Sequence, residues 1–398
     1  MDFDDIVIGS GLAALGTVMG LGAQRRVLVL GGPREGRFSH YDERQTVPSA
    51  FLGEGGLGND WHGVIPTGWN RNFAAGRDAG FTAMFEHFYP GSRVAQRLGQ
   101  PWLFVPWKPI RPRAGFDALQ RARGDHLVLR AELASTFRVQ SNGVAVESGS
   151  GTHRARRVWI AAGALHTPPL LERALGPGLA RGRVSDHVGC YVGQADGLPA
   201  PRIEHGPGGA FFQAWNGACP DALYTLRPAR FAFRTLDHGI EQRAVFGLPT
   251  GSAIAKITRR MSPGLLVEAF YNRFGLFAQA PRHSVYAQVL VRDAYTMAGD
   301  GTTLRPDAAA IRAATEAARA QAPFPGVRPS QRPELHIPGI HLHHSVDLEA
   351  LARAGGGDPS FPVRVVDASV LTEIGPEHHS FKMMLAAHDS AASVAGSD

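Results

Sequence analysis

Apolar residues along the chain fall into short runs separated by glycine-rich turns, and the first thirty residues show this pattern most clearly. The apolar runs at 6–8 and 27–30 predict two strands, and the apolar segment 15–21 between them predicts a helix. The residues Gly-Ser-Gly-Leu-Ala-Ala at 9–14 occupy the turn from the first strand into the helix. This order of strand, glycine-rich turn, helix and strand is the context of a dinucleotide-binding fingerprint.

The residue types in this turn suit a bound pyrophosphate. Gly9 permits the tight turn, Gly11 lets the backbone approach the phosphates, and Ala14 lets the helix pack close to the sheet. The exposed N–H groups and the positive dipole end of the helix then face the phosphates. The alternative is a tight turn without a ligand, and the flanking strands favour the cofactor.

The second strand ends differently from an ordinary fingerprint. An acidic residue usually follows that strand and holds a ribose hydroxyl. Here the strand ends in Gly31, Gly32 and Pro33, and the first acid is Glu35. Three candidates for the ribose contact therefore stay open, namely Glu35, a backbone group and a water molecule.

Three later segments also indicate places where the backbone lies close to a ligand. Glycine recurs through residues 53–63, where a tryptophan and a histidine argue against a merely flexible surface loop. Small residues fill 161–168, between a predicted strand and a predicted helix. A last predicted strand, 363–366, leads into Asp367, which either helps to orient the cofactor or caps the next turn.

Hydrophobic periodicity completes the expected fold. It predicts helices over 81–97, 170–175, 307–321 and 380–394, strands over 127–129, 136–146 and 157–160, and irregular backbone over 101–112. Alternating stretches between 191 and 333 predict a separate antiparallel sheet. The sequence therefore predicts an α/β fold, with a doubly wound, Rossmann-like cofactor domain and an antiparallel-sheet substrate domain. We expect residues 1–190 and 334–398 to form the cofactor domain and residues 191–333 the substrate domain.

Composition and charge narrow the function classes. The chain has 398 residues, which suggests about two domains, and its hydrophobic content of 44% is that of a globular protein. The net charge of +6 is scattered along the chain and comes mostly from arginine, so we expect no nucleic-acid partner. Cys190 and Cys219 give neither a disulfide framework nor a metal-ligand spacing. The chain starts directly with a strand and has no apolar run long enough to span a bilayer. We therefore expect a cytoplasmic protein without a membrane partner, acting on a small molecule.

Two histidine-rich segments carry the candidate chemistry. They are His341-Leu342-His343-His344 and His378-His379. A metal site is one interpretation, but carboxylates at ligand spacing are missing and both cysteines are remote, so we expect no metal. We prefer a pair of histidines that converge on the cofactor. One neutral imidazole would take the hydroxyl proton of an alcohol, and the other would hold the oxygen.

Together these motifs resemble the glucose-methanol-choline (GMC) oxidoreductases, which are FAD enzymes. The similar segments are the pyrophosphate unit at 6–30, the Gly-Gly loop at 55–61, a glycine-alanine segment at 158–168, Ser185-Asp186-His187, and the C-terminal flavin-binding strand at 364–370. The resemblance implies a short, FAD-dependent member of the family. The middle of the chain resembles no segment that we can place, and it is shorter than the family's substrate domain.

The resemblance also implies roles for individual residues. The family's first catalytic histidine corresponds best to His341, and its second catalytic position, histidine or asparagine, corresponds to His379. Of the two, we expect His379 to take the substrate proton and His341 to orient or share it. His344 and His378 are displaced by one position and stay alternatives. FAD contacts are implied for Gly9, Gly11, Leu12, Ala13, Ala14, Gly31, Gly56, Asn59, Asp60, Trp61, Ala162, Gly163, Asp367, Ala368 and His379.

Some GMC enzymes link FAD covalently to a histidine of the Gly-Gly loop. Asp60 occupies that place here, so the resemblance implies non-covalent FAD, with His62 as the local candidate for a link. The favoured function is an FAD-dependent oxidoreductase that oxidises an alcohol or sugar-type hydroxyl by hydride transfer to flavin, with a histidine base. Two alternatives stay open: a lyase, dehydratase or cyclase on the same FAD scaffold, and a basic binding protein without flavin.

Overall fold

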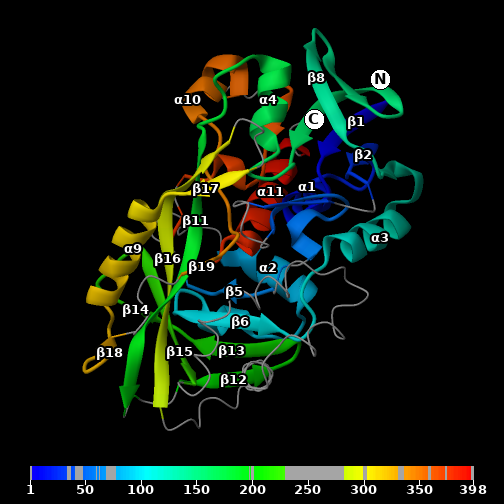
Figure 1. The fold of residues 1–398 in the computed structure, drawn as a ribbon. Helices are drawn as coiled ribbons and strands as arrows, with labels where there is room; N and C mark the ends of the chain where they lie inside the picture. The colour runs from blue at the N-terminus through cyan, green and yellow to red at the C-terminus, as the bar shows by residue number, and fades with distance from the viewer. Residues whose placement is uncertain are drawn as a thin grey trace.

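In the computed structural model, the described residues are 2–33, 37–40, 48–59, 61, 63–68, 78–196, 198, 201–228, 282–298, 303–329, 336–356, 360–372 and 374–395. Glu35, Asp60 and His62 lie outside these residues, and their expected roles stay predictions. The helices that matter below are α1 (Leu12–Gly20), α2 (Asp78–Phe88), α3 (Pro112–Arg123), α4 (Thr167–Leu175), α9 (Ala308–Ala320), α10 (Leu348–Leu351) and α11 (Ser380–Ala395). Figure 1 shows them around the sheets, coloured along the chain.

One mixed sheet contains strands from both ends of the chain. Its strands are β1 (Phe3–Ile8), β2 (Val27–Leu30), β7 (Leu127–Arg130), β8 (Ala134–Gln140), β9 (Gly143–Ser148), β10 (Gly151–Ile160) and β20 (Val363–Val365). The order is β7-β2-β1-β10-β9-β8, and β20 pairs with the last residues of β10. β7, β2, β1, β10 and β20 run parallel, whereas β8 and β9 form an antiparallel hairpin beside β10.

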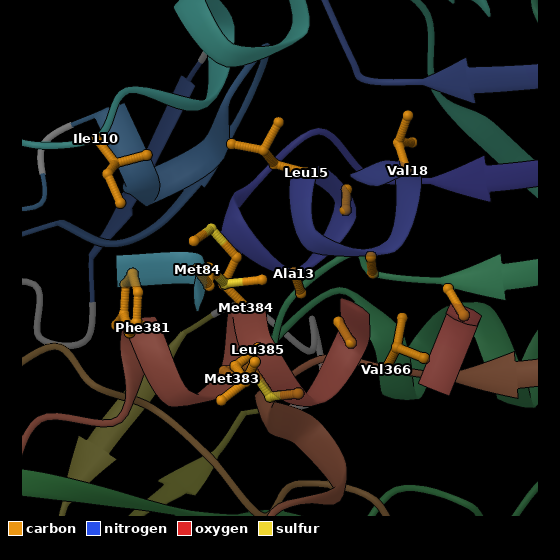
Figure 2. Close-up of a cluster of buried hydrophobic side chains, with 14 of the residues drawn as sticks. Ala13, Leu15, Val18, Met84, Ile110, Val366, Phe381, Met383, Met384 and Leu385 are labelled. Carbon is orange, nitrogen blue, oxygen red and sulfur yellow. The ribbon is translucent and has the colours of Figure 1, made fainter. Parts of the chain in front are cut away.

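The parallel strands are buried on both faces, which is why they read as continuous apolar runs. Val7 and Val29 belong to the core under α1 and α11, whereas Ile8 and Leu30 belong to the core under α4. In Figure 2, side chains of α1 and α11 meet in the first of these cores. The sheet is therefore a layer between two sets of helices, as a doubly wound fold requires.

Helices α1 and α11 pack against each other at unusually short range. A Cβ added at Gly16 would lie 2.1 Å from the carbonyl oxygen of Met384, and one at Gly20 would lie 2.2 Å from that of His388. Only glycine allows the two backbones to come this close. The first and last helices of the chain thus form one unit, which brings the start of α11 to the end of β1.

A second sheet is mainly antiparallel. Its strands are β11 (Arg183–Asp196), β14 (Trp215–Asn216), β15 (Ala222–Pro228), β16 (Arg282–Met297), β17 (Leu304–Pro306), β18 (Arg328–Pro329) and β19 (Ile337–Pro338). The long strands β11 and β16 form its centre, and α9 packs on it through Ile311 and Ala318. A smaller sheet has the order β12 (Ile203–Gly206), β13 (Gly209–Gln213), β6 (Trp102–Pro106) and β5 (Ile65–Pro66), and β3 (Arg37–His40) pairs with β4 (Pro48–Leu52).

The predicted fold class is confirmed, because a parallel Rossmann-like sheet and an antiparallel sheet are both present. Helix α9 confirms the helix predicted near 307–321. Two local predictions are wrong. The helix predicted over 81–97 ends as α2 at Phe88, because Pro90 and Gly91, which has a φ of 74°, turn the chain. The segment 101–112 is not irregular throughout, since β6 pairs with β5 and β13.

The structure also bears on the membrane prediction. Within the part of the chain that is described, no helix has the length and apolar character to cross a bilayer.

Candidate cofactor cavity and histidine cluster

A cavity of about 460 Å³ lies at the carboxyl ends of the parallel strands. Its wall consists of the turn after β1, the end of β2, the loop 52–58, the turn after β10 and the residues after β20. Open α/β sheets bind ligands at this edge, where the strand order changes direction. The volume lies within the roughly 300–1,000 Å³ that is typical of small-molecule and cofactor sites.

Much of the wall near β1 is backbone. A Cβ added at Gly56 or Gly163 would meet no atom within 4 Å, and one at Gly11 would meet only the Gly55 carbonyl oxygen, at 3.9 Å. The N-terminus of α1, which begins beside Gly11, has no side-chain cap. A ligand can therefore lie directly against the backbone here, with the N–H groups of the first helical turn toward it.

Ser10 connects three parts of this wall. Its Oγ donates to the Gly31 carbonyl oxygen at 2.8 Å and accepts from the Gly55 N–H at 2.7 Å. The hydroxyl thereby fixes the end of β2 and the glycine loop to the turn after β1. The sequence analysis missed this role, because the fingerprint allows any residue at this position and the partners are 21 and 45 residues away.

Asp367 fastens the end of β20 to the turn after β10. Its carboxylate accepts hydrogen bonds from the Gly163 N–H at 2.8 Å, the Thr167 hydroxyl at 2.6 Å and the Ser369 N–H at 2.9 Å. The last of these caps the short helix η7 (Ala368–Val370). Asp367 also lines the cavity. Asp367 therefore caps η7 and also lies at the cavity wall, so its position fits both of the roles considered from the sequence.

Most of the residues implied as FAD contacts line this cavity. They are Gly9, Gly11, Leu12, Ala13, Gly31, Gly56, Ala162, Gly163, Asp367, Ala368 and His379. Ala14, Asn59 and Trp61 are not among the lining residues; Ala14 is buried in α1, and the Asn59 amide donates to the Glu54 carbonyl oxygen. His166 lines the cavity without having been predicted, although it lies in the segment 158–168 that suggested the family.

Five histidines from three parts of the chain gather beside the cavity. His187 lies on β11, His341 and His343 follow β19, and His378 and His379 precede α11. Ring centroids of neighbouring members are 4.3–5.9 Å apart. Both His341 and His379 line the cavity. The two C-terminal clusters do lie together, and a third segment, which the sequence analysis did not count, supplies His187.

His344 lies outside this group of five. Its Nδ1 is 2.9 Å from Nη1 of Arg181, which also donates to its carbonyl oxygen at 2.8 Å. Arg181 in turn pairs with Asp293 at 3.0 Å. Because a guanidinium only donates, Nδ1 of His344 is the acceptor in this contact.

The closest pair in the group is His341 and His378. Nε2 of His341 is 3.0 Å from Nδ1 of His378, and the amide nitrogen of Gln288 is 3.2 Å from the same Nδ1. That amide nitrogen also donates to the Pro376 carbonyl oxygen at 2.8 Å, which fixes it as the donor end of the amide. Nδ1 of His378 therefore accepts, and the Nε2–H of His341 donates to it. In this tautomer, Nδ1 of His341 carries the lone pair.

Asp186 holds the backbone that carries His341. Its carboxylate accepts from the N–H groups of His341 at 2.7 Å, His187 at 2.8 Å and Ile340 at 3.2 Å, and from the Tyr295 hydroxyl at 3.1 Å. The residue is fully buried on β11, and burial raises its pKa to about 7. Asp186 thus joins β11 to the segment after β19.

Burial also sets the charge of the inner histidines. It lowers the pKa of His187, and together with the neighbouring imidazoles it lowers the pKa values of His343 and His379 well below the ordinary value. These three rings are therefore neutral at neutral pH. Neutral imidazoles each offer one lone pair, which suits proton acceptance or ligand binding.

Comparison with known proteins identifies the fold. No protein-family model and no curated protein sequence matches the chain. A fungal aryl-alcohol oxidase matches with a TM-score of 0.51 and 14% identity, over 100% of this chain and 99% of that chain. A formate oxidase of Aspergillus oryzae matches with a TM-score of 0.50 and 10% identity, over 99% and 98%. The chain has the GMC oxidoreductase fold.

The GMC fold is a fold of FAD-dependent oxidoreductases. The cavity lies between the ends of the parallel strands and the segments that carry the histidines. The parallel sheet provides the glycine turns, and the segments after β19 and before α11 provide the histidines. Asp367 is the one acidic side chain, among the described residues, that lines the cavity. At the end of β2 the described lining residues are Gly31 and Gly32, with Leu133 and Ala134 beside them, and none of these four has an acidic side chain.

Proposed function

We propose that the protein binds FAD in this cavity and oxidises a CH–OH group of an alcohol or sugar-type substrate. The cavity fits the cofactor in three respects: its volume, the open space beside Gly11, Gly56 and Gly163, and the uncapped N-terminus of α1. The residues that would hold the pyrophosphate are those of the turn 9–13, and backbone at the end of β2 or water would hold the ribose. A bound flavin supplies the hydride acceptor for the oxidation.

The observation that carries the proposal is a hydrogen-bonded imidazole pair at the wall of a cavity with a dinucleotide cradle. Removing a hydride from an alcohol carbon requires that the hydroxyl lose its proton in or before that step. A neutral imidazole with its lone pair toward the substrate can accept that proton. His341 lines the cavity and, in the tautomer that Gln288 imposes, carries its lone pair on Nδ1.

His378 gives the accepted proton a way out. When Nδ1 of His341 gains a proton, its Nε2–H can move to Nδ1 of His378, 3.0 Å away. His378 is half-buried, whereas His379 is only 5% exposed. We therefore propose His341 as the proton acceptor, with His378 as its partner. The sequence analysis placed His379 first for this role, and in this proposal His379 instead forms part of the cavity wall.

Spectroscopy of the purified protein tests the proposal. The protein should be yellow and release FAD on denaturation, and an anaerobic panel of primary, secondary, aromatic and sugar alcohols should include one that bleaches the flavin. His341→Ala and His378→Ala should keep the flavin but slow its reduction by about two to four orders of magnitude, the usual worth of a general base. His344→Ala, which changes a histidine outside the group of five, is the matched control and should reduce at the wild-type rate.

Each failure has a distinct meaning. A colourless protein that does not bind added FAD would exclude the flavin and leave the binding-protein alternative. A yellow protein that converts an alcohol without any change in its flavin spectrum would favour the lyase, dehydratase or cyclase. Reduction at the wild-type rate in both histidine variants would remove the pair from the mechanism and return His379 to first place.

A further inference from the structure

We propose that His187, His343 and His379 form a site for one divalent transition-metal ion of the zinc, cobalt or nickel type. One ring nitrogen of each residue lies within 4.8 Å of those of the other two, and all three side chains are at least nine-tenths buried. The residues come from β11, from the segment after β19 and from the start of α11. A metal ion here would connect β11 and the segment after β19 to the start of α11.

The hydrogen bonds of His187 and His343 show which nitrogen of each ring carries the lone pair. Nδ1 of His343 is 2.9 Å from the His341 carbonyl oxygen, and Nε2 of His187 is 2.8 Å from the Gly375 carbonyl oxygen. A carbonyl only accepts, so both of these nitrogens carry the proton. The lone pairs are then on Nε2 of His343 and Nδ1 of His187. Metal-binding histidines commonly donate their other ring N–H to a backbone carbonyl in this way.

Two of the ring nitrogens are otherwise unsatisfied. Nδ1 of His187 and Nδ1 of His379 are buried and have no hydrogen-bond partner among the residues that the structure describes. A buried ring nitrogen without a partner destabilises the folded state, because it has lost its hydrogen bond to water and gained none in return. A cation that takes up the lone pairs removes this cost. Imidazole nitrogens favour zinc, copper and nickel over magnesium or calcium.

The spacing needs only a small adjustment to become a metal site. Three atoms within 4.8 Å of one another share a point no more than about 2.8 Å from each, which is 4.8 Å divided by √3. Zinc binds imidazole nitrogen at about 2.0–2.1 Å, so each ring has to approach by less than about 1 Å. Three protein ligands would leave the fourth position of a tetrahedral ion to water. The carboxylate of Asp186 accepts from the backbone N–H of His187 and so fixes the strand that carries this ligand.

The sequence argument against a metal did not include His187. It counted the two C-terminal clusters and found no further ligand, because His187 precedes the nearer cluster by more than 150 residues. The inference is independent of the flavin, and the proposed proton acceptor His341 and its partner His378 are not ligands in it.

Metal analysis of the protein without an affinity tag tests the inference. Wild-type holoprotein should contain, or after treatment with a chelator take up, one equivalent of Zn²⁺ or Co²⁺ per chain. Bound Co²⁺ should show the intense visible bands of a tetrahedral site, beyond the flavin absorption. His187→Gln and His343→Gln keep an amide that can donate to the carbonyls of Gly375 and His341, so these variants should fold and lose the metal. His153→Gln is the matched control, since His153 is also buried but lies elsewhere, against Ser148 and Ser150.

The outcomes separate this inference from the proposed function. A folded wild-type protein that takes up neither Zn²⁺, Co²⁺ nor Ni²⁺ would overturn the metal site, whatever its flavin content. Uptake that is unchanged in both His187→Gln and His343→Gln, or lost equally in His153→Gln, would also overturn it. Uptake that is lost only in the two cluster variants supports it, even in a protein that fails to reduce flavin with any alcohol.

Discussion

The two sides of the cavity differ in what forms the wall: backbone on one side and histidine side chains on the other. On the side of the parallel sheet the wall is mostly backbone, held in place by Ser10 and Asp367. On the side of the histidines the wall depends on side chains that three distant segments bring together, with Asp186 and Gln288 behind them. The shape of the first side depends on glycines, which have no side chain to fill the cavity. The second is shaped by which nitrogen of each side chain carries a proton.

This difference separates binding from chemistry in the proposed enzyme. A backbone cradle offers N–H groups whose position follows from the local turn, so it tolerates changes in sequence as long as the glycines stay. An imidazole network depends on tautomers, and each tautomer depends on the next hydrogen-bond partner. We therefore expect substitutions on the backbone side to change flavin binding, and substitutions on the histidine side to change the rate of flavin reduction.

The largest effect is expected at Gly11. Its added Cβ would point into the cavity, and its φ of −77° is open to any residue. Gly11→Val should therefore fold but carry no flavin, because the side chain fills the space of the pyrophosphate. Flavin absorbance of the purified variant and its uptake of added FAD measure this.

Gly9→Ala is the contrasting variant. Gly9 has a φ of 116°, and an added Cβ would lie 2.1 Å from the Ala161 carbonyl oxygen. This change should lower the melting temperature or prevent folding, which circular dichroism detects. Wild-type FAD affinity in Gly11→Val would show that the turn shapes the fold and binds no pyrophosphate.

The same contrast explains how far the sequence could predict the site. The turn 9–14 and the strand 363–366 carry their pattern within a few neighbouring residues, so the sequence alone predicted that they lie together at a cavity. Gln288 carries no local signal, and the segment Ser185-Asp186-His187 suggested the family but not a place beside the other histidines, because the partners of His187 and Gln288 lie 90 to 190 residues away in the chain. The helix predicted over 81–97 failed for a related reason: apolar spacing continued beyond Pro90, and the turn residues decided the end.

Asp186→Asn should have the next largest effect, on the histidine side. The carboxylate accepts from four donors, and an amide nitrogen cannot accept, so Ile340 or His341 loses a partner. We expect flavin content to stay near wild type and flavin reduction to slow by about tenfold to a hundredfold, since a shift of about 1 Å in a catalytic group costs this much.

A double variant shows whether Asp186 acts through His341. If it is a positioning residue, Asp186→Asn should slow reduction far less in a His341→Ala background than in the wild type. Equal slowing in both backgrounds would assign Asp186 a general structural role. The melting temperature of each variant gives the accompanying loss of stability, about 1–3 kcal/mol for an unsatisfied buried group.

Asp367→Ala, on the backbone side of the cavity, should lower both the flavin affinity and the stability. The variant loses the acceptor of the Gly163 and Thr167 hydrogen bonds and the cap of η7. We expect flavin affinity to fall by about tenfold and stability to fall by about 1 kcal/mol, the typical worth of a cap. Titration of the apoprotein with FAD and a thermal melt measure the two separately. Unchanged FAD affinity with lowered stability would reduce Asp367 to its capping role.

The smallest effect is expected at Gln288, which lies on β16 and touches the proposed chemistry only through His378. Its amide nitrogen makes Nδ1 of His378 an acceptor, and this directs the Nε2–H of His341 toward it. Gln288→Leu keeps the volume but removes that donor, so the two imidazoles can take other tautomers. One neutral hydrogen bond is worth about 0.5–1.5 kcal/mol, so flavin reduction should slow by about threefold to tenfold. The same substitution in a His378→Ala background should have almost no further effect, because the tautomer it controls is gone. A full additional slowing in that background would show that Gln288 acts on something other than the imidazole pair.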